Sequence, residues 1–140
     1  GNLVVDAFVH NLYLRTQNNN ISLLTNLNFE VFCYENADRT TMHAAIDDFE
    51  ARLPGYDVAL FYYAGHGFEC NGHNLLMPVD TNGVDAGYRE WMALDLEYLI
   101  SALEGKNHNN TLKTKIIILD ACRQDGTGTV YAWFPSQGSV

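Results

Sequence analysis

Apolar residues along this 140-residue chain fall into two kinds of pattern that alternate. Short runs rich in β-branched, aliphatic and aromatic residues predict strands. Longer segments between them carry apolar residues three or four positions apart, which is the spacing of one helix face. The predicted strands lie at 29–34, 57–65, 115–121 and 130–134.

Two segments show the helical pattern clearly. The first can be capped by Asp38 or Thr40 and stops at Pro54-Gly55. The second can be capped by Asp95 and ends at Gly105. Both helices therefore lie between predicted strands.

Two further segments carry weaker signals. A helix is predicted over 15–27, although the three consecutive asparagines there favour caps and turns. A short extended piece is predicted at 74–80, where Pro78 would confine it to the edge of a sheet.

The order of these elements predicts the fold. Strand, helix, strand, helix, strand implies right-handed crossovers and a mostly parallel sheet with helices on both faces. The aliphatic run at 116–119 fits, because a strand covered on both faces has no polar side. We therefore predict an α/β fold. Because no repeat or linker divides the sequence, we also predict a single domain over residues 1–140.

Composition narrows the classes of partner. The eight Lys and Arg residues are scattered and the net charge is −9, so we predict no nucleic-acid partner and favour a basic one. Apolar runs fall short of the roughly 20 residues that cross a bilayer, and no signal peptide is visible, so we predict no membrane association. The three widely spaced cysteines suggest no disulfide framework, and we expect a cytoplasmic location.

Candidate chemistry lies at the carboxyl ends of two predicted strands, where ligands bind in open α/β sheets. One strand is predicted to finish at Ala64 and to turn through Gly65-His66-Gly67, where the glycines leave room for a ligand. The other ends in Asp120 and Cys122. A cysteine that attacks a carbonyl and a histidine that moves protons are the parts of a thiol hydrolase.

The spacing of these two residues carries more information. Cys122 follows His66 by 56 positions and stands in D-A-C-R-Q, close to the histidine-to-cysteine spacing and cysteine motif of caspases. The stretches "FYYAGHG", "NLLMPVD" and "IIILDACR" resemble the caspase-like domain of paracaspases and their bacterial relatives, in the caspase and metacaspase clan. The resemblance implies a three-layer caspase-like sandwich and a cysteine peptidase.

Residue roles follow from the resemblance. It implies that His66 and Cys122 form the catalytic dyad and that the amides of Gly67 and Cys122 form the oxyanion hole. It further implies that Asp120 belongs to an acidic S1 pocket selecting Arg or Lys at P1. Strand alternation independently puts Asp120 and Cys122 on one face, so one carboxylate could hold a cation near the thiol.

The resemblance also implies where the chain departs from the family. The family's first strand is expected to precede residue 1, and its last strand, through which relatives dimerise, is expected beyond Val140. We thus predict a domain truncated at both ends, and a possible homodimer if the parent protein has that strand.

Other interpretations of the same residues stay open. Cys122 could be a small buried hydrophobe, His66 a structural histidine, and Asp120 a cap on a local backbone N–H. His66, Cys70, His73 and Cys122 are all zinc-ligand types, but their spacing matches no common zinc module, so we predict no metal.

The sequence thus predicts a cysteine endopeptidase acting on peptides or proteins, with cleavage after basic residues and no cofactor. The alternative is a catalytically impaired caspase-like module that acts through binding.

Overall fold

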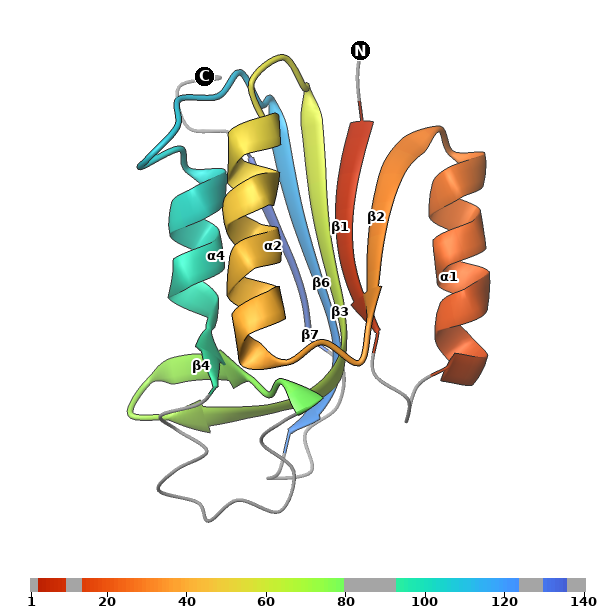
Figure 1. Ribbon diagram of the computed structural model, residues 1–140, viewed down its shortest axis with the longest axis vertical. Coiled ribbons are helices and arrows are strands. Elements are labelled where there is room, and N and C mark those ends of the chain that lie inside the picture. The colour runs from red at the N-terminus through yellow and green to blue at the C-terminus, as the bar shows by residue number, and fades with distance from the viewer. Residues whose placement is uncertain (1–2, 10–13, 80–92, 124–129, 136–140) are drawn as a thin grey trace.

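The computed structural model describes residues 3–9, 14–79, 93–123 and 130–135 (Figure 1). At 14–19, 70, 121–123 and 130–135 it describes the backbone alone. The strands are β1 (Leu3–Val9), β2 (Phe29–Glu35), β3 (Val58–Cys70), β4 (His73–Leu76), β5 (Leu94–Asp95), β6 (Thr114–Arg123) and β7 (Val130–Pro135). The helices are α1 (Leu14–Asn26), α2 (Arg39–Arg52) and α4 (Leu96–Leu103).

One sheet connects all seven strands. Its central part has the order β2-β1-β3-β6-β7, in which β1, β2, β3 and β6 run parallel and β7 runs antiparallel to β6. The strands β4 and β5 add an antiparallel extension to the carboxyl end of β3. The predicted mostly parallel α/β fold is therefore confirmed.

Helices cover both faces of the sheet (Figure 1). On one face α2 and α4 pack on the larger core, which includes Phe49, Leu99, Phe61 and Ile117. On the other face lies α1, above a smaller core with Leu24 and Tyr62. The weakly predicted helix at 15–27 is thus present, and it supplies the third layer.

Local chemistry explains where the helices begin. The Asp38 side chain accepts a hydrogen bond of 2.7 Å from the N–H of Thr41, which confirms Asp38 as the cap of α2. The Asp95 side chain does the same for the N–H of Glu97 at the start of α4. The turn between β3 and β4 uses Asn71 and Gly72, both with positive φ.

The sheet differs from the sequence prediction in two places. A strand that the sequence pattern did not indicate lies at Leu3–Val9, in the interior of the sheet between β2 and β3. The prediction of an edge strand at 74–80 is wrong, because β4 pairs with β3 on one side and with β5 on the other. Pro78 follows β4, so it removes no hydrogen bond from the ladder.

One buried acid stands out in the sheet. Asp6 lies in the middle of β1 and is fully buried, and in the described part of the chain neither carboxylate oxygen has a hydrogen-bond partner. Burial raises the pKa of Asp6 from 3.8 to about 8, although the positive charge of Arg52 on α2 opposes this shift. Asp48, also on α2, raises the pKa a little further.

None of the described helices combines the length and the hydropathy that crossing a membrane would require.

Candidate active site

The carboxyl ends of β3 and β6 lie side by side. These two strands pair in parallel over ten residues, from Val58 beside Thr114 to Gly67 beside Arg123. Within this register His66 is the backbone partner of Cys122. The structure therefore brings together, on the backbone, the two positions that the sequence singles out for nucleophilic chemistry.

His66 lies where β3 changes neighbours. Before His66 in the chain, β3 pairs with β1 as far as Ala64. After His66, from Gly67 on, the same edge of β3 pairs with β4. The other edge of β3 stays paired with β6 throughout this stretch. The His66 side chain is half-buried. His66 therefore lies near the carboxyl ends of the parallel strands, where open α/β folds bind their ligands.

The Gly65-His66-Gly67 segment differs from the sequence prediction. The strand does not end at Ala64 but continues through both glycines to Cys70, and the reversal comes later, at Asn71 and Gly72. Both glycines are buried. The two glycines therefore do not form a turn. They lie within β3 where the strand bends (Figure 1), a position at which the lack of a side chain is useful.

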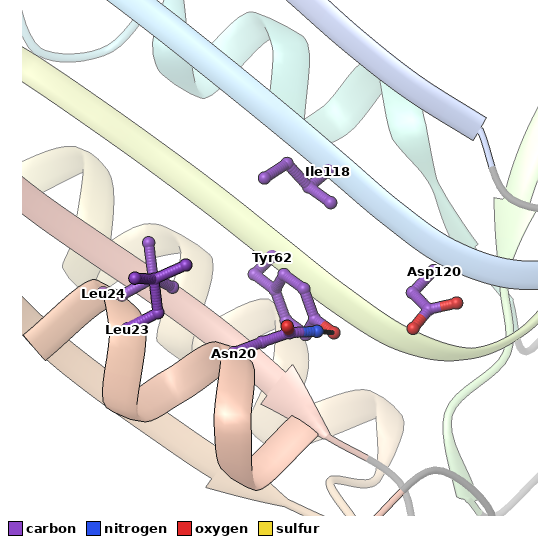
Figure 2. Close-up of a pocket in the computed structure, with 6 residues that line it drawn as sticks. All are labelled: Asn20, Leu23, Leu24, Tyr62, Ile118 and Asp120. Carbon is purple, nitrogen blue, oxygen red and sulfur yellow. Dashed lines mark hydrogen bonds between the residues drawn. The ribbon is translucent and has the colours of Figure 1, made fainter. Parts of the chain in front are cut away.

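Asp120 lines a pocket on the α1 face of the sheet (Figure 2). The cavity has a volume of about 150 Å³ and its walls come from α1, β3 and β6. The lining residues are Asn20, Leu23, Leu24, Tyr62, Ile118 and Asp120. Figure 2 shows the Asp120 carboxylate at the end of the pocket that is farther from the two leucines.

The pocket is apolar along its length and acidic at one end. Leu24 and Ile118 contribute aliphatic walls, and Leu23 is exposed at its rim. The Tyr62 hydroxyl accepts a hydrogen bond of 2.9 Å from the Asn20 amide, which ties α1 to β3 beside the cavity. A pocket with apolar walls and one acidic end can hold a long side chain that has an aliphatic stem and a positively charged end.

The zinc alternative is not tested, because the side chains of Cys70 and Cys122 lie outside the description. Among the side chains that are described, no three His, Cys, Asp or Glu residues gather closely enough to hold a metal ion. His73 instead pairs with Asp95, with 2.8 Å between its Nδ1 and a carboxylate oxygen.

Comparisons with known proteins identify the family of this chain. The family model described as "Caspase domain" matches residues 18–137, so the chain belongs to the caspase-domain peptidase family. The human mucosa-associated lymphoid tissue lymphoma translocation protein 1 is 29% identical over 103 residues, which cover 74% of this chain and 12% of that protein. The homologous mouse protein matches over the same length with the same identity. The chain thus spans about an eighth of the curated relatives it matches.

Proposed function

We propose that this chain is the catalytic domain of a cysteine endopeptidase in which Cys122 is the nucleophile and His66 the acid and base. The observation that supports this most strongly is the parallel register, in which these two residues are direct backbone partners at the end of adjacent strands. Family membership supports the same reaction class.

The proposed reaction is acyl transfer from a peptide bond to sulfur and then to water. His66 takes the thiol proton of Cys122 and the thiolate attacks the scissile carbonyl carbon. The amides of Gly67 and Cys122 hold the oxyanion of the tetrahedral intermediate. His66 then gives its proton to the leaving amine, which leaves a thioester on Cys122. Water hydrolyses the thioester, releases the acid and restores the thiol.

We further propose that the pocket beside Asp120 accepts a basic P1 side chain. An arginine or lysine stem would lie against Leu24 and Ile118, and its positive end would reach the Asp120 carboxylate. The net charge of −9 supports a basic substrate, because it attracts cationic peptides. The proposed substrates are therefore peptides or proteins with accessible basic residues.

The substitution Asp120→Asn tests the pocket. We expect kcat/KM for an arginine-P1 peptide to fall about 10- to 100-fold, since a hydrogen bond to a charged group contributes about 1.5–3 kcal/mol. A leucine-P1 peptide with the same flanking residues should be cleaved by the variant and the wild type at rates within about twofold. Fluorogenic peptides of both kinds measure this directly.

The matched control is Asp48→Asn, which removes a carboxylate from the exposed side of α2. It should leave both rates unchanged. If Asp120→Asn lowers cleavage of both peptides equally, Asp120 holds the local backbone and does not select the substrate.

A further inference from the structure

The Tyr63 hydroxyl makes an unusual contact with the backbone of the proposed site. Tyr63 is fully buried in β3, and its ring packs in the core under α2 and α4. Its hydroxyl lies 2.7 Å from the His66 carbonyl oxygen and 2.9 Å from the Met77 carbonyl oxygen, and it donates to both. One hydroxyl proton is therefore shared between the two sides of the β3–β4 hairpin.

This contact requires a curved strand. Three residues of a straight strand span about 10 Å, so a side chain seldom reaches the carbonyl three positions ahead on its own strand. Figure 1 shows that β3 curves strongly towards β4 near its carboxyl end. The Met77 N–H also donates to the His66 carbonyl, at 3.0 Å. Tyr63, His66 and Met77 thus form one hydrogen-bonded cluster where β3 curves.

This cluster holds the His66 backbone on the edge of β3 that is opposite to the edge paired with Cys122. Met77 follows β4, which pairs with one edge of β3, while β6 and Cys122 pair with the other edge. By strand alternation Tyr63 has the opposite parity to His66, so its ring lies on the α2 face and its hydroxyl reaches only the main chain of His66. By the same alternation the His66 side chain belongs to the α1 face, the face that also carries Asp120.

We propose that the Tyr63 hydroxyl is a positioning group for the dyad: it sets the curvature of β3 and thereby aims the His66 imidazole and the Gly67 amide at residue 122. This inference rests on the proposed function. The Tyr63 ring belongs to an apolar core cluster that includes Phe61 and Phe8, the residue beside Tyr63 on β1, so burial of the ring does not itself require a hydroxyl. What the hydroxyl adds is the fixed position of two carbonyls, one of which belongs to His66.

The substitution Tyr63→Phe tests the proposal, because it keeps the ring and removes the hydroxyl. We expect kcat for an arginine-P1 peptide to fall about 10- to 100-fold, since small displacements of a catalytic group cost up to about 100-fold. KM should stay within about twofold, because the pocket lies on the other face of the sheet. A purely structural role would leave kcat of the folded fraction unchanged.

The matched control is Tyr98→Phe. Its hydroxyl donates to Asp47, so this contact links α4 to α2 and does not involve β3 or β4. We expect its kcat to equal that of the wild type. If Tyr63→Phe is folded and keeps kcat within twofold of the wild type, the proposal is overturned.

Two further measurements cover the remaining outcomes. If Tyr63→Phe does not fold, p-aminophenylalanine at position 63 restores a donor of nearly the same shape. We expect this variant to fold and retain at least a third of the wild-type kcat, and a folded but inactive protein would contradict us. If the wild type itself shows no Cys122-dependent turnover, the proposed function fails separately. The NMR chemical shifts of the His66 imidazole then decide. We expect them to change in Tyr63→Phe, and unchanged shifts would overturn the positioning role.

Discussion

Replacing Cys122 by alanine is expected to reduce hydrolysis of an arginine-P1 peptide by on the order of 10³-fold or more, to the uncatalysed background. The reason is chemical: without sulfur no thioester forms, and His66 has no thiol from which to take a proton. The measurement is initial-rate fluorimetry with a peptide that carries a fluorogenic leaving group. It should be made both on the chain as it is and after fusion to a dimerising helix.

The same chain provides a control for thiol chemistry in general. Cys33 on β2 is a free thiol. Desolvation raises its pKa, and the negative charge of Glu35 raises the pKa further, so Cys33 is a poor nucleophile. The variant Cys33→Ala should therefore keep full activity. A wild-type chain without any Cys122-dependent turnover, even when dimerised, would favour a caspase-like module that acts through binding.

The second large effect concerns the buried acid Asp6. We expect the free energy of unfolding of the wild type to fall as pH rises from about 4 to about 8, by on the order of 5 kcal/mol from this residue alone. The variant Asp6→Asn should lack this contribution. Urea unfolding at pH 5, 7 and 9 measures the difference between the two proteins.

The sign follows from which state holds the proton. The unfolded chain releases the Asp6 proton near pH 4, whereas the folded chain keeps it until about pH 8. Between these values only the folded state binds the proton, so each pH unit costs about 1.4 kcal/mol of stability. The contribution is complete below pH 4 and is lost once pH has risen through 8.

The readout is the pH dependence and not the absolute stability, because the asparagine amide remains a buried polar group. Asp48→Asn is the control. Asp48 contributes least to the shift of the Asp6 pKa, so this variant should keep most of the fall in stability. If the free energy of unfolding falls equally with rising pH in Asp6→Asn and in the wild type, the folded protein does not hold a proton on Asp6.

Asp6 also explains why the first strand could not be predicted. Residues 3–9 are apolar except for this carboxylate, which faces the core under α2. A buried acid without a hydrogen-bond partner is unfavourable, so the sequence pattern argues against an interior strand there. The pairing of β1 with both β2 and β3 holds the strand in place, and this pairing cannot be read from residues 3–9 alone.

The helices and the strands β2, β3, β6 and β7 could be predicted from the sequence because each has a local cause. The aliphatic run of β6 and the caps Asp38 and Asp95 act within a few residues. The antiparallel place of β4 was missed because it depends on β5, a strand of two residues without a recognisable pattern.

The candidate site was predictable in part. The sequence singles out His66, Cys122 and Asp120 from their positions at strand ends, and the register makes the first two backbone partners. Their roles in catalysis and substrate binding stay predictions. The pocket walls were not foreseen, because Asn20 and Leu24 reach them only through the packing of α1 on the sheet. The same holds for Tyr63, whose hydroxyl contacts depend on the curvature of β3.

The most direct test of the account is covalent labelling with a peptidyl arginine chloromethyl ketone, followed by peptide mapping. We predict one adduct per chain, on Cys122, with a labelling rate at least tenfold lower in His66→Ala than in the wild type. Cys33 and Cys70 are present in the same chain as internal references. Equal labelling of all three cysteines, or a rate independent of His66, would contradict the proposed dyad.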